Sequence, residues 1–176
     1  MSKIKFICPP LICFIIAISV QAWALEIKSS AFSEGEEINS QYTCDGDDTS
    51  PALNWGGVPA GTKSLALICE DPDSPSKVWS HWVVFNMPAD KAGFAEGVAK
   101  TGTLSDGTVQ GVNNFGRVGY NGPCPPPNGV HRYFFKLYAL DTNLLLDKTS
   151  TREALLEAIQ GHVIGEAQTH CTYQRM

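Results

Sequence analysis

The amino-acid sequence predicts a mainly β domain, most simply an antiparallel two-sheet β-sandwich with one C-terminal helix packed outside. Short apolar runs with strand-like patterns recur along the chain. Glycine and proline, which account for 16 and 11 of the 176 residues, separate those runs. Only one stretch, near the C-terminus, has the spacing of an amphipathic helix.

The composition narrows the class of protein. Hydrophobic residues make up 43% of the chain and charged residues 18%, which excludes a disordered tail protein. The 13 Lys and Arg residues against 18 Asp and Glu give a net charge of -5, so no sequence-wide basic field attracts nucleic acid. Only one apolar run is long enough to consider as a membrane segment, which excludes a polytopic membrane protein. One globular domain of ordinary size remains.

The first 24 residues are typical of a secretory signal peptide. Lys3 and Lys5 give a positive start, residues 11–20 are almost wholly apolar, and Ala22-Trp23-Ala24 has the pattern of a signal-peptidase site. The apolar run is shorter than the about 20 residues that a membrane-spanning helix needs. We therefore expect cleavage after Ala24 and a domain of residues 25–176 without a stable membrane anchor, exported to the periplasm or secreted by a bacterium. An uncleaved N-terminal anchor is the alternative.

Export would place the remaining cysteines in an oxidising environment. Cys44, Cys69, Cys124 and Cys171 follow the leader, and four thiols allow three pairings. Cys44 and Cys124 lie in loops rich in Gly and Pro, where the chain direction is adaptable, so we favour a disulfide between them. Cys69 and Cys171 are then expected to be buried thiols that pack as small hydrophobes. No Cys-x-x-Cys pair or compact Cys/His cluster indicates a zinc site.

Three runs have the composition of buried strands, at residues 64–69, 82–87 and 133–140. Residues 169–173 are a candidate for a last strand. Residues 102–130 read as one long loop that is rich in Gly and Pro. A loop of that length in a compact domain is usually functional.

One helix is predicted to begin near residue 150. Ser150 and Glu153 fit a capping box, which satisfies amide donors at the start of a helix. Leu155, Leu156, Ile159 and Val163 follow with helical spacing, which predicts one buried face.

The first two segments with candidate chemistry adjoin the predicted strands. In Asp71-Pro72-Asp73-Ser74-Pro75, alternation along an extended chain would send both carboxylates to the same side. A solvated turn explains the same residues equally well. In Trp79-Ser80-His81-Trp82, His81 and Trp82 point to opposite faces if the strand is regular. A single histidine beside an apolar strand is more often structural than functional.

The third segment is Gly119-Tyr120-Asn121-Gly122-Pro123-Cys124-Pro125-Pro126, which is followed by His131-Arg132-Tyr133. Glycines there can expose backbone amides, while prolines hold the loop rigid. His131 and Tyr133 share one side of an extended chain, and Arg132 faces away. Amides near an imidazole and a phenol would suit an anionic group such as phosphate or carboxylate. A rigid surface loop before an ordinary strand is the structural alternative.

Several short segments also occur in a specific order along the chain: Tyr42-Thr43-Cys44-Asp45-Gly46, Thr49-Ser50-Pro51-Ala52-Leu53-Asn54-Trp55, Gly57-Val58-Pro59-Ala60-Gly61-Thr62-Lys63-Ser64, Asp71-Pro72-Asp73-Ser74-Pro75, His81-Trp82-Val83-Val84, Asn114-Phe115-Gly116, His131-Arg132-Tyr133, Gly165-Glu166-Ala167 and Tyr173-Gln174-Arg175. Together they cover essentially the whole chain after the leader. In this the sequence resembles the phosphatidylethanolamine-binding protein family (the Raf kinase inhibitor-like proteins), in its bacterial YbhB/YbcL type.

The resemblance implies a compact β-sandwich with a small anion-binding cavity at its surface. The implied ligand-binding residues are Asp71, Asp73, His81, Pro123, His131 and Tyr133. The implied ligand is a phosphate, an acetate-like anion or a phosphoethanolamine headgroup, with no cofactor and no metal. An unidentified partner protein that the domain modulates is a further expectation. One departure from the family pattern is Asn114, where the bacterial type often has Asp, and this puts a loop hydrogen bond in question.

Other classes of function remain open at this point. A weak hydrolase for small esters or phosphoesters could use the same Asp and His residues, but no Gly-x-Ser-x-Gly elbow or activated nucleophile is visible, so we expect no enzyme. A metal held by Asp71, Asp73, His81 and His131 is chemically conceivable. A protein-interaction module is a third alternative. Carboxylates beside imidazoles raise histidine pKa values, so we expect His81 and His131 to carry charge and hold the anion.

Overall fold

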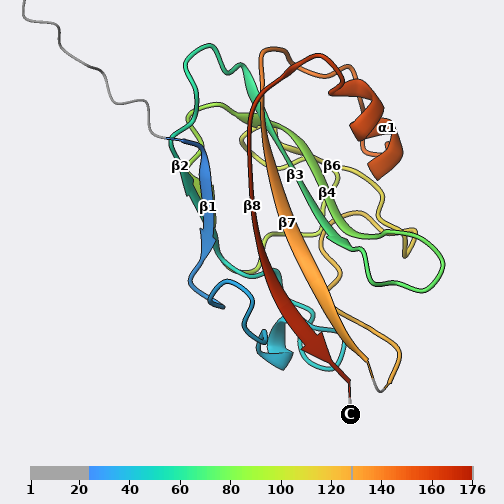
Figure 1. Cartoon of the computed structure of the whole chain (residues 1–176). Coiled ribbons are helices and arrows are strands. Elements are labelled where there is room, and N and C mark those ends of the chain that lie inside the picture. Colours follow the sequence, from blue (N-terminus) through green and yellow to red (C-terminus); the bar gives the residue numbers. More distant parts are fainter. Residues whose placement is uncertain (1–23, 128, 176) are drawn as a thin grey trace, which may run out of the picture.

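The computed structural model describes residues 24–127 and 129–175 as a sandwich of two sheets (Figure 1). The larger sheet has the strand order β6-β4-β3-β7-β8, and the smaller sheet has the order β1-β2-β5. All pairings within both sheets are antiparallel. The predicted mainly β two-sheet sandwich is therefore confirmed. The expected signal peptide lies almost wholly in residues 1–23, outside the described residues.

The elements follow one another along the chain with these bounds: β1 Glu26–Ser29, a 3-10 helix Ser40–Tyr42, β2 Leu53–Gly56, β3 Ser64–Asp71, β4 Trp79–Pro88, β5 Gly93–Phe94, β6 Val109–Gln110, β7 Val130–Leu140, α1 Arg152–Ala158 and β8 Val163–Gln174. Each predicted strand is present and longer than its apolar run, because the polar residues at the ends also join the ladders. In the described part of the chain, no helix is long and apolar enough to cross a membrane.

The main core lies between the two sheets. From β3, Leu65, Leu67 and Cys69 point into it, and each is fully buried. The alternate residues Ala66 and Ile68 point to the other face of the large sheet, where they pack in a second cluster with the helix. Figure 1 accordingly shows β1 and β2 on one side of the large sheet and α1 on the other.

The helix begins one residue later than the capping box predicted. Thr151 is the N-cap, and its hydroxyl accepts a hydrogen bond from the Ala154 amide. Ser150 instead bonds to the Asp147 amide in the preceding turn. Leu155 is fully buried as predicted, but Val163 lies in β8 and is 39% exposed, so its predicted place on the helix was wrong.

Cys69 and Cys171 are buried, and they are the cysteines of the described residues that form no disulfide. Both pack in the core between the sheets, as the sequence predicted for thiols that form no disulfide.

A buried carboxylate joins three elements on the helix side of the large sheet. Glu70 on β3 is only 3% exposed. Its two oxygens accept bonds from Arg152 Nε at 2.5 Å and Lys136 Nζ at 2.6 Å. Glu70 therefore ties the first residue of α1 and the middle of β7 to β3.

Replacing Glu70 by Gln is expected to lower the free energy of unfolding by about 3 kcal/mol, because both cations lose their buried partner. The matched control is Glu26→Gln, which removes an exposed carboxylate paired with Lys28. That change is expected to cost less than about 0.5 kcal/mol. Urea unfolding of the three proteins measures the difference, and equal losses in the two variants would show that the buried cluster does not hold these elements together.

Candidate functional site

A β-bulge in β4 determines where His81 points. Trp82 lies opposite Cys69 and Ser80 opposite Glu70, so His81 is an extra residue on β4. A bulge re-aims side chains and breaks regular alternation. The ring of His81 meets Tyr133 with centroids 5.1 Å apart, while Trp82 meets Phe94. Because Tyr133 and Phe94 both belong to the core between the sheets, the opposite orientation expected of a regular strand does not apply.

The backbone of the long loop fixes the protonation of His81. The Nδ1 atom lies 2.8 Å from the carbonyl oxygen of Asn121 and 3.0 Å from that of Gly122. Carbonyl oxygens only accept hydrogen bonds, so Nδ1 carries the proton. In the neutral ring Nε2 then has a free lone pair.

The charge expected on His81 is not supported. Burial lowers the pKa of His81, because removing the ring from water disfavours its charged form. The two carbonyl bonds and the nearby Asp71 carboxylate oppose this effect only in part. His81 therefore acts as a neutral acceptor at its free nitrogen.

Asp71 and His131 form a buried pair at the ends of two neighbouring strands. Asp71 is the last residue of β3 and 4% exposed, and its Oδ2 lies 2.7 Å from His131 Nδ1. The carboxylate accepts the bond, so Nδ1 of His131 is the donor and Nε2 is the nitrogen left for other contacts.

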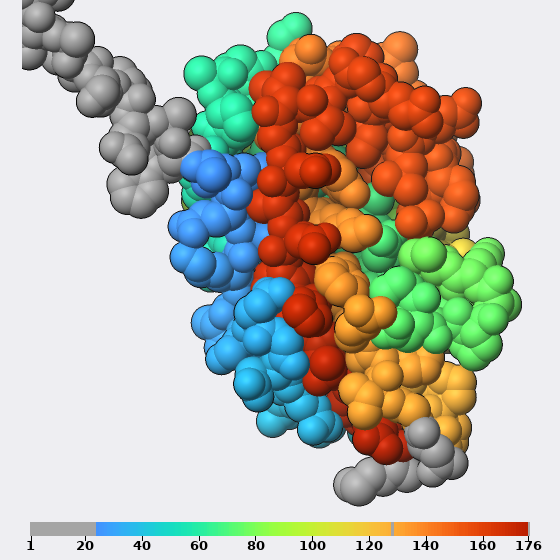
Figure 2. Space-filling model, in the orientation of Figure 1, coloured from blue at the N-terminus to red at the C-terminus, as the bar shows by residue number. Residues whose placement is uncertain are grey.

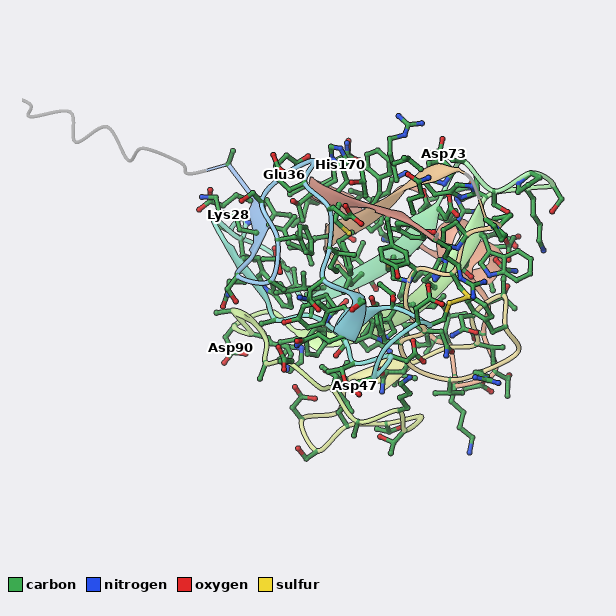
Figure 3. The ribbon with its side chains drawn as sticks, turned by 90° about the horizontal axis from the view of Figure 1, so that it is seen from below. Lys28, Glu36, Asp47, Asp73, Asp90 and His170 are labelled. Carbon is green, nitrogen blue, oxygen red and sulfur yellow. A yellow bond between two sulfur atoms is a disulfide. The ribbon has the colours of Figure 1, made fainter. Side chains whose placement is uncertain are left out.

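Asp73 does not join this pair. The chain turns after Asp71, whose Oδ1 accepts the Asp73 amide at 2.8 Å, so alternation no longer applies. Asp73 instead binds Arg132 through two guanidinium bonds of 2.7 and 2.9 Å and a backbone bond of 3.0 Å. This ion pair holds the pKa of Asp73 at about 2. Figure 3 shows Asp73 at the edge of the molecule.

Tyr133 contributes a hydroxyl without a partner. The residue is fully buried, and its oxygen meets no partner at hydrogen-bond geometry in the described part of the chain. The Cys124 backbone lies near this oxygen, but an amide there could only donate to it, so the proton of the hydroxyl still has no acceptor. Burial and the Asp71 charge raise the pKa of Tyr133 far above its ordinary value, so the phenol stays protonated. Buried polar groups without partners are rare in proteins, which makes this hydroxyl a candidate donor to a ligand.

A disulfide joins the long loop to residues 42–48. Cys44 and Cys124 are bonded, with their Cα atoms 5.4 Å apart, which confirms the predicted pairing. The Cys44 amide also donates to the carbonyl of Pro123 at 3.1 Å. At Gly122, a Cβ atom would come within 2.1 Å of the Tyr42 carbonyl oxygen, so only glycine fits this close approach. Pro123, predicted as a ligand-binding residue, thus shares a segment with the carbonyls that hold His81.

Asp48 holds the same loop and was missed from the sequence. Its Oδ1 accepts the Gly122 amide at 2.6 Å, and its Oδ2 accepts the Asn121 side chain at 2.9 Å and Lys100 at 2.6 Å. Asp48 therefore acts on His81 indirectly, by holding Asn121 and Gly122, the two residues whose carbonyls bind the imidazole. No local pattern predicts this contact, because Asn121 and Gly122 lie 73 and 74 residues further along the chain.

The departure from the family pattern at Asn114 leaves the loop hydrogen bond intact. The side-chain oxygen of Asn114 accepts bonds from the Ser80 amide at 2.6 Å and the Ser80 hydroxyl at 3.0 Å. An amide oxygen serves here as a carboxylate oxygen would.

A pocket of about 360 Å³ adjoins His81. It is lined by Cys44, Asp48, Phe115, Arg117, Asn121, Gly122 and Cys124. Phe115 forms a wall that also meets the His81 ring edge-on, at 5.3 Å between centroids. Asp71, His131 and Tyr133 are not in its lining, so it lies beside the predicted residues rather than among them.

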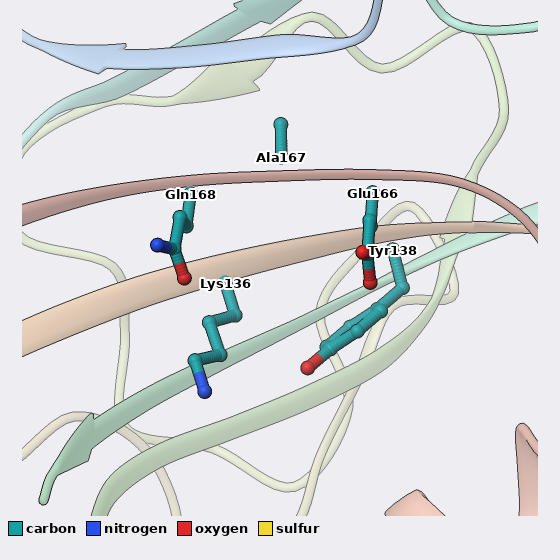
Figure 4. A pocket seen from close by; sticks show the side chains of 5 residues that line it. All are labelled: Lys136, Tyr138, Glu166, Ala167 and Gln168. Atoms are coloured by element: carbon teal, nitrogen blue, oxygen red, sulfur yellow. The ribbon is translucent and has the colours of Figure 1, made fainter.

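A second pocket, of about 440 Å³, lies on the opposite face of the large sheet. Figure 4 shows Lys136, Tyr138, Glu166 and Gln168 leaving β7 and β8 on one side, with Ala167 on the other. In the space-filling view of the same strands, this face is hollowed between them (Figure 2). Lys136 there is bonded to Glu70, and His81 and Tyr133 point to the other side of the sheet.

The alternative metal site is not formed. Within residues 24–127 and 129–175, no group of three or more His, Cys, Asp and Glu side chains is placed to hold a metal ion. Asp73 is engaged with Arg132, and His81 uses Nδ1 for the loop carbonyls.

Replacing Asp48 by Asn is expected to loosen the hold on His81. An amide has only one acceptor oxygen, so it cannot accept both the Gly122 amide on one side and Asn121 and Lys100 on the other. The variant should lower the free energy of unfolding by about 1–3 kcal/mol and give imidazole ¹⁵N shifts of a mixed His81 tautomer. The matched control is Asp47→Asn, which removes the same charge from the exposed neighbouring residue (Figure 3). A single Nδ1–H tautomer in Asp48→Asn would contradict the role given to Asp48.

The lowered pKa of His81 predicts a loss of stability on acidification. Below pH 6.5, the ordinary value for this side chain, the unfolded chain binds a proton that the folded chain does not, so stability falls with pH. Urea unfolding between pH 7.5 and 5.5 should show a steeper loss in the wild type than in His81→Gln. The Asp73 effect lies below pH 3.8 and does not overlap this window. Identical slopes in the two proteins would refute the assignment.

Comparison with known proteins agrees with this architecture. The profile of the phosphatidylethanolamine-binding protein family matches residues 28–174. A UPF0098 protein of Methanothermobacter thermautotrophicus is 56% identical over 151 residues, which cover 86% of this chain and 99% of that protein. A UPF0098 protein of Aquifex aeolicus is 44% identical over 86% of this chain and 89% of its own length.

Two solved structures have the same fold. Escherichia coli YbcL, described as a member of the mammalian PEBP family, superposes with a TM-score of 0.83 at 34% identity, over 88% of this chain and 100% of its own. The PEBP homologue CT736 of Chlamydia trachomatis gives a TM-score of 0.78 at 41% identity, over 87% and 99%. The chain therefore belongs to the phosphatidylethanolamine-binding protein family.

Proposed function

We propose that this protein binds a small phosphate-type anion at the end of the sandwich where His81, His131 and Tyr133 lie. The observation that carries the proposal is the buried Tyr133 hydroxyl without a partner, in ring contact with His81. A ligand oxygen at this point would accept the bond that the protein itself leaves unmade. The family to which the chain belongs bears the name of a lipid whose headgroup carries a phosphate, and a phosphoethanolamine headgroup is one form of such a ligand.

The hydrogen-bonding roles of the three side chains describe the ligand. Tyr133 can only donate to an anion, because its phenol is protonated. His131 is oriented by its Nδ1 bond to Asp71 and presents Nε2, which as an imidazolium donates to an anionic oxygen. The neutral His81 offers an acceptor at Nε2. A ligand that has both anionic oxygens and one hydroxyl group, such as hydrogen phosphate or a singly protonated phosphate monoester, satisfies all three.

We propose binding without turnover. A hydrolase working at these residues would need a nucleophile activated by one of the histidines. The Ser80 hydroxyl donates to Asn114 instead, and in the described residues neither Ser74 nor Ser80 is hydrogen-bonded to His81 or His131. This favours a binding protein over the alternative of a weak esterase or phosphoesterase.

Export of the protein is part of the same proposal. The expected leader at residues 1–24 and the Cys44–Cys124 disulfide both suit an oxidising compartment outside the cytoplasm. Modulation of a partner protein by the occupied site is the further step, which a pull-down with and without phosphate would test.

Isothermal titration with inorganic phosphate and with sulfate tests the site. Phosphate at pH 7 carries a proton that can donate to His81, whereas sulfate carries none, so phosphate should bind at least about tenfold more tightly. Tyr133→Phe should weaken phosphate binding by about tenfold without loss of stability, because the hydroxyl has no partner in the free protein. His131→Ala should weaken it at least as much.

The matched control is His162→Ala. His162 forms an exposed pair with Asp141 at 2.8 Å, which corresponds to the buried pair of His131 with Asp71. The affinity of the His162→Ala variant for phosphate should equal that of the wild type. Equal affinity in wild type, Tyr133→Phe and His131→Ala would exclude the proposed site.

A further inference from the structure

An aromatic and cationic surface borders the proposed site. It consists of Lys77, Trp79, Phe115 and Arg117, and we call it the rim. The Lys77 ammonium lies 5.8 Å from the Trp79 ring, and Trp79 meets Phe115 edge-on at 5.6 Å. Phe115 in turn meets His81. Lys77, Trp79 and Phe115 thus form a chain of contacts that reaches a residue of the proposed phosphate site, and Arg117 lines a pocket together with Phe115.

The charges on the rim are unusual for this chain. The sequence is acidic, and most basic side chains in its described part form ion pairs. Within residues 24–127 and 129–175 the basic side chains without an ion pair are Lys63, Lys77, Arg117 and Lys148. Two of these four belong to the rim. Unpaired cations beside a site raise the local concentration of anions.

Arg117 also lines the pocket of about 360 Å³ with Phe115 and the Cys44–Cys124 disulfide. Asp48, the acidic residue of that lining, is already bonded by Lys100, Asn121 and Gly122. Its charge is therefore compensated, and the guanidinium is the group left to receive a ligand. Phe115 is 37% exposed, lines this pocket with Arg117 and meets the His81 ring edge-on, so it offers an apolar wall beside both.

We propose that Arg117 and this pocket form a second anion subsite, which binds a further negatively charged group of the ligand held at His131 and Tyr133. The ligand class is an organic phosphate that carries a carboxylate or a second phosphate, with its apolar body against Phe115. A guanidinium suits either group, because it can donate two parallel hydrogen bonds to carboxylate or phosphate oxygens. This inference rests on the proposed phosphate site.

Titration with three probes separates the two subsites: inorganic phosphate, phenyl phosphate and 4-carboxyphenyl phosphate. In the wild type the carboxylate should make the third probe bind at least about fivefold more tightly than phenyl phosphate. Arg117→Gln should abolish that gain and change the affinity for inorganic phosphate less than about twofold. Arg117 is exposed, and its side chain forms no hydrogen bond or ion pair within the described residues. The variant should therefore fold normally, which circular dichroism checks.

The matched control is Lys63→Gln, which removes another unpaired exposed charge. The backbone amide of Lys63 donates to the carbonyl of Leu140, at the opposite end of β7 from His131. Because Lys63 lies away from the proposed site, the affinities of Lys63→Gln for all three probes should match those of the wild type. The inference is overturned if the carboxylate adds nothing in the wild type, or if Arg117→Gln weakens all three probes equally while phosphate still binds. If no probe binds the wild type, the proposed phosphate site itself fails.

Discussion

The segment Asn121–Gly122 is the constraint on which the rest of the site depends. The carbonyls of its two residues fix the tautomer of His81, which a bulge in β4 has turned toward the core between the sheets. Asp48 holds the segment in turn, and the Cys44–Cys124 disulfide lies two residues after Gly122 and four residues before Asp48. Preorganisation of this kind removes the entropic cost of ordering the site when a ligand binds. The segment Asn121–Gly122, which belongs to no helix or strand, thereby fixes the position of the His81 ring.

The last two residues of β3, Glu70 and Asp71, place one carboxylate on each face of the large sheet. Glu70 points to the helix side and joins α1 to β7. Asp71 points to the core side and orients His131. Because successive residues of a strand face opposite ways, one strand end supplies a structural ion cluster and a positioning group for the site. Burial of both acids is tolerated since each has a hydrogen-bonded basic partner.

Local patterns in the sequence were sufficient for the long strands β3, β4, β7 and β8, because burial leaves an apolar run that does not depend on the rest of the chain. They missed β1, β2, β5 and β6, which have only two to four residues each, too few to form a pattern. The smaller sheet was therefore not predicted strand by strand, and residues 102–130, read as one loop, contain β6. The Cys44–Cys124 pairing could also be predicted, since both cysteines lie in loops of adaptable direction. The capping residue was misplaced by one position because Ser150 and Thr151 are both good caps, and only the turn at Asp147 decides between them.

What could not be predicted depends on contacts between distant residues. The bulge at His81 arises from pairing with β3 and leaves no mark in the local pattern. The pKa of His81 is lowered because the effect of burial outweighs that of the neighbouring Asp71 carboxylate. The sequence showed the carboxylate but not the burial. Asp73 was grouped with Asp71 by alternation along the chain and by the family resemblance, whereas the turn between them places Asp73 beside Arg132.

A crystal structure of the protein grown with phosphate would show whether the Tyr133 hydroxyl binds the ligand. We expect a phosphate oxygen within hydrogen-bond distance of that hydroxyl and a second within reach of Nε2 of His81, with the Asn121–Gly122 segment unmoved. A phosphate bound elsewhere, with the Tyr133 hydroxyl still without a partner, would contradict it.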